Sequence, residues 1–139
     1  MKKIPVIYWS GTGNTQAMAE SIAAGLAEAG AEAEVIEVSS ADASALAECE
    51  KIAFGCPATG SEELEEYEFE PFFTAVESSL AGKKVALFGS YSWGDGQWMR
   101  DWIERTESAG ANILDEGLIA QDTPDLAECV EYGKKFAAF

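Results

Sequence analysis

A loop rich in glycine and hydroxyl residues separates the first apolar run of the chain from the first helical pattern. It consists of Ser10, Gly11, Thr12, Gly13, Asn14 and Thr15. Such a loop turns several backbone N–H groups toward one point, and the dipole of the following helix favours negative charge there. The glycines permit positive φ angles, and the polar side chains supply further hydrogen bonds. The loop therefore predicts a phosphate site.

Residues that nucleotide-binding motifs require are absent from this loop, and their absence limits the kind of phosphate ligand that it can bind. Met18 and Ala19 stand in the region where the nucleoside-triphosphate motif G-x-x-x-x-G-K-[ST] needs lysine and a hydroxyl residue. Gln16 stands where G-x-G-x-x-G needs its third glycine. A loop without a cation suits one monophosphate. The alternative is that these residues form only a tight strand-to-helix turn with a serine or threonine cap.

Two further loops follow expected strands and suit a planar ligand. Loop 56–62 offers backbone amides that can border a ring, at Ala58, Thr59, Gly60, Ser61 and Glu62. Loop 90–96 contains two aromatic side chains among small and polar residues: Ser90, Tyr91, Trp93, Gly94 and Asp95. Taken separately, loop 56–62 is an ordinary turn, and a tryptophan in a loop such as 90–96 more often anchors a core. Beside a phosphate loop, an exposed tryptophan favours a stacked ligand ring.

Strands and helices alternate along the chain, which is typical of a doubly wound parallel α/β sheet. Apolar runs predict strands at 3–8, 35–38, 51–55, 84–91 and 112–120, the last interrupted near Gly117. Helical spacing predicts helices at 14–29, 42–49, 69–79 and 96–109, and a last helix capped by Thr123 with Pro124 at its first position. Pro5 lacks a ladder donor and is expected near the start of its strand or at an irregularity. In such sheets, ligands bind where the strand order reverses.

Composition restricts the class of protein. The chain has 139 residues, of which 47% are hydrophobic, and we expect one domain over residues 1–139. Twenty-five acidic against nine basic residues give a net charge of −16, which argues against nucleic acid or an anionic membrane as partner. Six glutamates fall within nine residues: Glu62, Glu63, Glu65, Glu66, Glu68 and Glu70. They serve either solubility alone or docking to basic proteins.

The rare residue types argue against several chemistries. Three cysteines without C-x-x-C spacing and the absence of histidine argue against a zinc site, a disulfide framework and a histidine-based triad. Cys56 is expected to be a small buried residue. No apolar run approaches the ~18 residues of a membrane span, and the start of the chain is too short for a signal peptide. A cytoplasmic location is therefore expected.

Together the three loops resemble those of the flavodoxin family, in particular its short-chain members. Residues 8–15 are similar to the family's phosphate motif, residues 88–96 to its aromatic flavin loop, and Glu70-Pro71-Phe72 follows the acidic loop as in relatives. The fifth strand has no long insertion of the kind that marks long-chain members. The resemblance covers essentially the whole chain. It implies a flavodoxin-like, five-stranded parallel sheet of order 2-1-3-4-5 with helices on both faces.

The resemblance also implies an FMN site. Residues 10–15 with Ser90 would bind the phosphate, Trp93 would stack on the outer face of the isoalloxazine, and residues 59–62 would border the ring. The Gly60-Ser61 peptide would offer its carbonyl to the ring N5–H on reduction, and Glu62 would accept from N3–H. Gln121 and Asp122 would reach the ribityl hydroxyls. Three residues depart from the family pattern: Thr59 for methionine, Ser92 for glycine and Pro57 for a hydroxyl residue.

The implied function is electron transfer rather than enzymatic catalysis. The protein would be a monomeric, low-potential one-electron carrier that uses the semiquinone and hydroquinone states of FMN and docks on redox proteins with basic surfaces. Acids near the ring would oppose its negative charge on reduction. One alternative is an NAD(P)H-dependent flavin or quinone reductase. Such an enzyme binds a second, phosphate-bearing cofactor, which a surface as acidic as this one would repel. Another is a phospho-acceptor domain, but the acids that hold Mg²⁺ in such domains are replaced by Tyr8-Trp9 and Gly55-Cys56.

Overall fold

The computed structural model describes residues 3–139, so Met1 and Lys2 of the expected N-terminal segment lie outside the described residues. The strands are β1 (Lys3–Tyr8), β2 (Glu32–Glu37), β3 (Lys51–Gly55), β4 (Lys84–Tyr91), β5 (Asn112–Ile113) and β6 (Leu118–Gln121). The α-helices are α1 (Asn14–Glu28), α2 (Phe69–Glu77), α3 (Gln97–Ser108) and α4 (Leu126–Ala138). Two 3₁₀ helices, η1 (Val38–Ser40) and η2 (Ala43–Glu48), connect β2 to β3.

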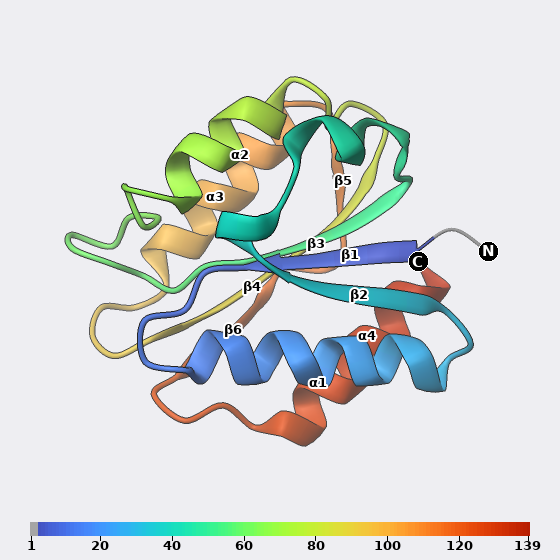
Figure 1. The fold of residues 1–139 in the computed structure, drawn as a ribbon. Helices are drawn as coiled ribbons and strands as arrows, with labels where there is room; N and C mark the ends of the chain where they lie inside the picture. The colour runs from blue at the N-terminus through green and yellow to red at the C-terminus, as the bar shows by residue number, and fades with distance from the viewer. Residues whose placement is uncertain (1–2) are drawn as a thin grey trace.

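The sheet is parallel, and its strand order is β2-β1-β3-β4-β5. Helices α2 and α3 cover one face, and α1 and α4 cover the other (Figure 1). Each face has its own apolar core, one built around Phe54, Phe73 and Trp102 and the other around Val6, Ile22 and Phe136. This arrangement confirms the predicted doubly wound sheet.

The expected interruption of the fifth strand is confirmed. β5 pairs with the start of β4 and β6 pairs with its end, from Phe88↔Leu118 to Tyr91↔Gln121. Between them the chain turns through Gly117, whose φ is +79°. The two pieces together occupy the position of the fifth strand.

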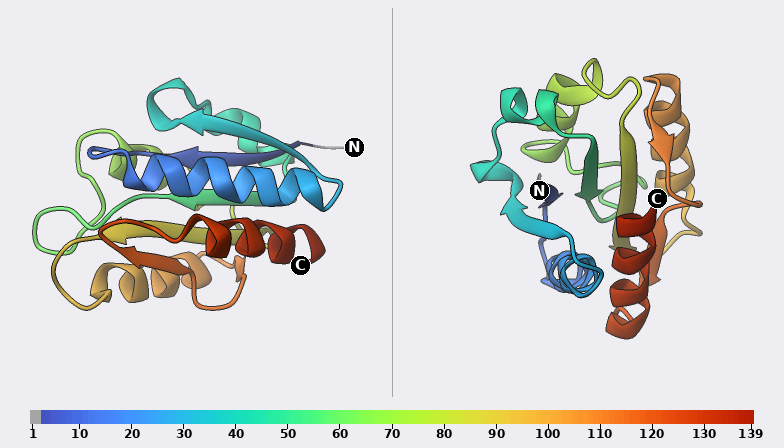
Figure 2. Two further views of the ribbon diagram at one scale, coloured as in Figure 1. Left: turned by 90° about the horizontal axis from the view of Figure 1, so that it is seen from below. Right: turned by 90° about the vertical axis from the view of Figure 1, so that its right-hand side faces the viewer.

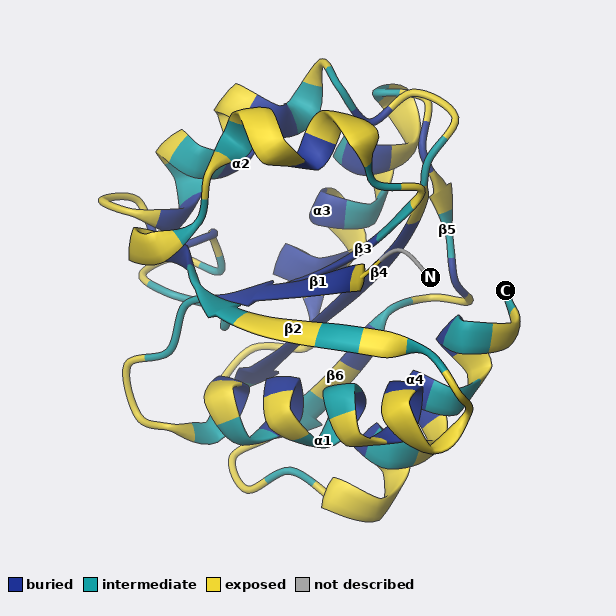
Figure 3. Cartoon of the chain, turned by 45° about the vertical axis from the view of Figure 1, so that its right-hand side comes forward, coloured by how far each residue is buried: buried dark blue, intermediate teal, exposed yellow. Residues whose placement is uncertain are grey.

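The middle and edge strands differ in burial. In Figure 3, β1 is almost wholly buried, whereas β2 is largely exposed or intermediate. Pro5 lies in β1 opposite Glu34 of β2, before the pairing of β1 with β3 begins at Val6. This position agrees with the expectation that Pro5 lies near the start of its strand.

Three predicted boundaries were wrong. The helix expected at 42–49 is the six-residue 3₁₀ helix η2, because Leu46 is its sole buried residue and one anchor cannot define an amphipathic face. β2 begins at Glu32 rather than at Val35 and ends at Glu37, and the buried Val38 begins η1 instead. The last helix is capped by Asp125 rather than Thr123, since the Asp125 carboxylate accepts hydrogen bonds from Ala127 N (3.1 Å) and Glu128 N (3.3 Å).

Helices α1 and α4 cross at two glycines that keep their backbones in close contact. A methyl group at Gly25 would overlap the Val130 carbonyl oxygen, and one at Gly133 would overlap the Ile22 carbonyl oxygen. The crossing therefore allows no side chain at either position without moving a helix. It fixes α1, and with it the loop that precedes α1, against the sheet.

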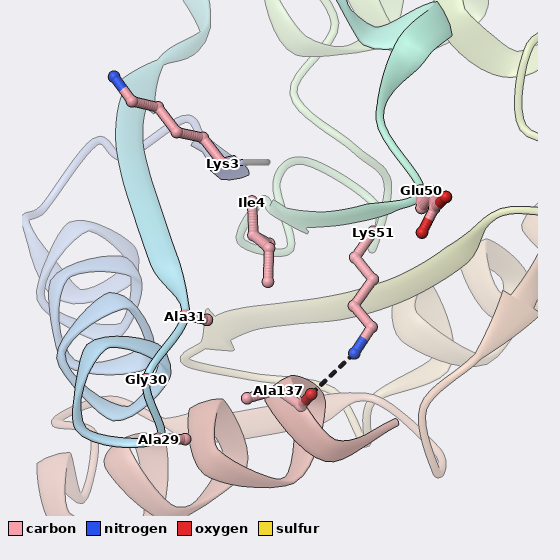
Figure 4. A pocket seen from close by; sticks show the side chains of 8 residues that line it. All are labelled: Lys3, Ile4, Ala29, Gly30, Ala31, Glu50, Lys51 and Ala137. Carbon is pink, nitrogen blue, oxygen red and sulfur yellow. Dashed lines mark hydrogen bonds between the residues drawn. The ribbon is translucent and has the colours of Figure 1, made fainter. Parts of the chain in front are cut away.

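Lysines hold the end of α4 at the amino ends of the strands. Lys51 Nζ donates to the carbonyl oxygens of Phe136 (3.0 Å) and Ala137 (2.8 Å), and Lys84 Nζ donates to the Phe139 oxygen (2.7 Å). Lysine at a helix C-terminus satisfies its last carbonyls and complements its dipole. A hollow of about 390 Å³ opens here, in which Lys51 reaches toward α4 while Lys3 extends away (Figure 4). This end of the molecule therefore carries Lys3, Lys51 and Lys84, with Glu50 beside them.

No helix among residues 3–139 combines the length and apolar character that a membrane crossing requires.

Candidate functional site

The three loops singled out in the sequence meet at the carboxyl ends of β1, β3 and β4. Trp9 N donates to Gly55 O (3.0 Å), which joins the residue before the first loop to the residue before the second. Ala58 N donates to Ser90 O (3.0 Å), which joins the second to the third. The hydroxyls of Thr15 and Ser90, both buried, lie 3.1 Å apart and join the third to the first. The loops thus form one continuous rim.

The first loop opens into α1 without a side-chain cap. Gly13 is the N-cap residue, with φ +97°, and the first turn of α1 holds no acidic side chain. Within the loop, Gly13 N donates to Ser10 Oγ (3.0 Å), and Asn14 N lies 3.5 Å from Thr12 Oγ1. Because no carboxylate competes at the start of α1, its first N–H groups and its dipole are available to an anion. Gly11, Thr12 and Gly13 are exposed, as a ligand site requires.

The second loop is closed on itself. Thr59 N donates to Glu63 O (2.8 Å), Glu63 N donates to Thr59 O (2.9 Å), and Thr59 Oγ1 also donates to Glu63 O (3.1 Å). Gly60 at the tip has φ +54°, with open space where a side chain would lie. Ser61 is exposed and Ala58 is half-buried. The hydroxyl of Thr59 thus holds the loop closed from within.

The third loop presents a tryptophan to solvent. Trp93 is 64% exposed, whereas Tyr91 packs against the buried Trp98, with ring centroids 5.4 Å apart. A slot of about 140 Å³ separates the loops, lined by Ala58 and Gly60 on one side and Ser92 and Trp93 on the other. An exposed indole at the side of a narrow slot is suited to cover one face of a planar group.

Glu62 and Gln121 fix the third loop. Glu62 Oε1 accepts from Asp95 N (3.0 Å) and touches Gly94 so closely that a methyl group there would overlap the carboxylate. Gln121 Nε2 donates to Ser92 O (3.4 Å). All the predicted residues therefore lie on this rim, although Thr15, Ser90, Glu62 and Gln121 already make hydrogen bonds within the protein.

Comparison with known proteins gives a consistent result. The model of the flavodoxin family matches residues 6–133. The flavodoxin of Clostridium beijerinckii is 50% identical over 134 residues, which cover 95% of this chain and 97% of that protein. The flavodoxin of Megasphaera elsdenii is 45% identical, over 96% and 98% of the two chains. The solution structure of two-electron reduced M. elsdenii flavodoxin superposes with a TM-score of 0.90 at 46% identity, covering 98% of this chain and 99% of that one.

This chain belongs to the flavodoxin family.

Membership establishes the kind of function. Flavodoxins bind FMN and transfer electrons to redox partner proteins, so this flavodoxin is an electron carrier rather than an enzyme. Its own donor set fits that cofactor. The uncapped start of α1 suits a phosphate, and the slot beside Trp93 suits a planar ring.

The structural role of one carboxylate of this flavodoxin, that of Glu65, was not predicted from the sequence. Glu65 is 6% exposed, and its oxygens accept from Tyr67 N (2.8 Å), Glu68 N (2.7 Å) and Phe69 N (2.9 Å). These bonds satisfy backbone donors at the start of α2. Its position four residues ahead of the Phe69 helix was a usable signal, but the surrounding glutamates concealed it.

Only some of the six glutamates between residues 62 and 70 have carboxylates free to face solvent or a partner. Glu62 and Glu65 bind backbone N–H groups, Glu68 Oε1 accepts from Trp9 Nε1 (3.1 Å), and Glu70 pairs with Arg105. Glu63 and Glu66 are exposed. Half of this run of glutamates thus holds loop segments in place, and Glu70 holds α2 against α3.

Cys56 is buried, as expected. Burial raises the pKa of its thiol, and its sulfur accepts from Glu65 N (3.4 Å). These surroundings are those of a structural rather than a reactive cysteine.

The pair of Glu70 and Arg105 joins α2 to α3 and makes stability depend on pH. The two Arg105 η-nitrogens each lie 2.8 Å from a Glu70 oxygen, and this hydrogen bonding lowers the pKa of the Glu70 carboxyl below its ordinary 4.5. Because the folded-state pKa is depressed, the contribution is complete above pH 4.5 and is lost as the pH falls through the folded-state pKa.

Replacing Glu70 by glutamine should lower the free energy of unfolding at pH 7 by about 1 kcal/mol, a small value because the pair is partly exposed. The difference from the parent should shrink as the pH falls below the ordinary pKa of 4.5. Urea unfolding at pH 7 and at acid pH measures both. Glu20→Gln, at an exposed position of α1, is the control. A difference that stays constant with pH would contradict this assignment.

Proposed function

We propose that this flavodoxin is a low-potential one-electron carrier, with the FMN phosphate at residues 10–15 and the ring in the slot beside Trp93. The observation that carries the proposal is the joining of an uncapped helix N-terminus to that slot by the Thr15–Ser90 and Ala58–Ser90 hydrogen bonds. When bound, FMN supplies one-electron redox chemistry, while the protein supplies orientation and electrostatics.

The phosphate would receive backbone N–H groups of loop 10–15 and the start of α1, aided by the side chains of Ser10, Thr12 and Asn14. The side chains of Thr15 and Ser90 are hydrogen-bonded to each other, so these residues would hold this loop against β4 as well as contact the ligand. Since no basic side chain lies in the loop, binding would rest on hydrogen bonds and the dipole of α1.

Residues of the second and third loops would set the potential. Trp93 would cover the outer face of the ring and exclude water there. Glu62 would accept from the ring N3–H, and the Gly60 carbonyl would turn toward N5–H. The carboxylate of Glu62 lies between the second and third loops, where it accepts from Asp95 N, and would oppose added negative charge. Gln121 stays a candidate for the ribityl hydroxyls.

Partners with basic docking surfaces are supported by the distribution of charge. Glu63, Glu66, Asp95 and Asp122 are exposed at the carboxyl end of the sheet. Lys3, Lys51, Lys83 and Lys84 lie at the amino ends of the strands or next to them. The exposed carboxylates beside the site would face a basic partner. We also propose a monomer with one domain over residues 1–139. Unpaired Cys49, Cys56 and Cys129 support a cytoplasmic location.

Replacing Gly60 by valine tests the tuning role of the second loop. Glycine passes freely between backbone conformations, so a β-branched residue should raise the free energy of the peptide turned toward the ring by roughly 1–2 kcal/mol. The two one-electron potentials of bound FMN should therefore approach each other by roughly 40–90 mV, the same energy in one-electron units. Gly60→Ala should give a smaller change.

Redox titration of the FMN-loaded variants measures this separation. An unchanged separation in Gly60→Val with FMN still bound would overturn the tuning role. Steady-state NADPH oxidation with a quinone tests the carrier function itself. Rapid turnover there would contradict it in favour of a reductase.

A further inference from the structure

A groove of about 690 Å³ runs along α3, outside the flavin loops. One wall consists of residues of α3 and its cap at helical spacing, from Gly96 to Glu107, and the other is the segment 115–119 that leads into β6. Ile103, which is half-buried, and Ile119, which is 38% exposed, supply its apolar surface, and the buried Met99 also lines it. The groove therefore presents partly exposed aliphatic surface between its two walls.

The groove lies at an edge of the sheet. Within residues 3–139, β6 pairs with β4 alone, so its outer backbone groups have no strand partner. Figure 2 shows β6 and α3 side by side at this edge. An unpaired edge beside an apolar groove suits an extended segment, which can add backbone hydrogen bonds to β6 and place alternate side chains in the groove.

The rim of the groove is negative. Glu104, Glu107 and Glu116 are exposed, and no ion pair to them is found in the described chain. At one end of the groove, Arg100 forms an ion pair with Asp95 and donates a hydrogen bond to Gln97. At the other end, the Asp115 carboxylate lies 3.8 Å from Lys135 Nζ. Three uncompensated carboxylates around an aliphatic floor complement lysine or arginine side chains that flank an apolar one.

We propose that this groove docks an extended segment of a redox partner protein, in which basic residues alternate with an aliphatic side chain. The inference rests on the proposed carrier function and names a further contact surface for it. Gly96 belongs both to the groove and to the loop that presents Trp93. A segment bound here would therefore hold its protein beside the exposed edge of the flavin site.

The test uses the FMN-loaded, ¹⁵N-labelled protein and the blocked peptide Lys-Leu-Lys-Leu-Lys as probe. Amide shifts should concentrate on residues 96–107 and 115–121. The variant Glu104→Gln/Glu107→Gln/Glu116→Gln should bind the peptide about tenfold more weakly, since each exposed pair contributes little alone. The control Glu20→Gln/Glu28→Gln/Glu32→Gln removes the same charge from exposed positions of α1 and β2 and should change binding little.

Three results would overturn the docking site: equal weakening in both triple variants, shifts confined to the flavin loops, or equal binding of Lys-Ser-Lys-Ser-Lys. Groove shifts that change with protein concentration without peptide would assign the groove to a second copy of this chain instead. FMN affinity and potentials are measured on the same variants. Loss of FMN binding in the parent would count against the proposed function, whereas selective loss of peptide binding bears on the groove alone.

Discussion

Replacing Glu65 by alanine is expected to lower the free energy of unfolding by about 3 kcal/mol, because it leaves backbone donors unsatisfied at a buried site. Three N–H groups donate to this carboxylate, all at the start of α2, and the side chain is 6% exposed. The same change releases the segment from Glu65 to Phe69, which connects the loop containing Thr59 and Glu62 to α2. FMN affinity should therefore fall together with stability.

Urea unfolding of the FMN-free proteins measures the first effect without the contribution of the ligand. Glu66→Ala is the matched control, since Glu66 is the exposed neighbour of Glu65 and its loss should cost less than about 0.5 kcal/mol. Equal unfolding midpoints for the two variants would show that the Glu65 hydrogen bonds do not hold the loop.

Replacing Trp93 by alanine should weaken FMN binding by roughly 10–100-fold, the range found when an aromatic residue that stacks on a nucleic-acid base is removed. The stability of the FMN-free protein should scarcely change, because Trp93 is 64% exposed. Trp93→Phe should lose less, since it keeps a flat aromatic surface. Fluorescence titration of FMN into the three proteins gives the affinities.

The outcome separates a stacking residue from a core residue. Loss of stability in the FMN-free Trp93→Ala protein, with an FMN affinity within about twofold of the parent, would contradict the stacking role. Tyr91 gives the contrasting case. It packs against the buried Trp98 of α3, and its replacement should act first on stability.

The sequence allowed the sheet order and the three loops to be predicted, because each rests on local patterns or on the family resemblance. Apolar runs located β1, β3 and β4, and the glycines of Ser10–Thr15 located the start of α1. The segment 42–49 was less predictable, since a single buried leucine does not distinguish an α-helix from a 3₁₀ helix. At the last helix, Thr123 and Asp125 are both residue types that cap helices well, and the local pattern does not distinguish them.

Contacts between distant residues were not predictable from local pattern. The Thr15–Ser90 hydrogen bond joins residues 75 positions apart. The bond from Asp95 N to Glu62 joins two loops whose separate patterns do not indicate which residues meet. Thr59 shows the same limit, because its substitution for methionine gave no sign that its hydroxyl would hold the loop closed.

The most direct test of the account is a titration of the FMN-free protein with FMN, riboflavin and FAD, followed by flavin fluorescence. The protein should bind one FMN per chain. Riboflavin should bind more weakly by about 100-fold or more, because it lacks the phosphate that the uncapped start of α1 and loop 10–15 would bind. FAD should not replace FMN. Equal affinity for riboflavin and FMN would contradict the central claim that this loop is a monophosphate site.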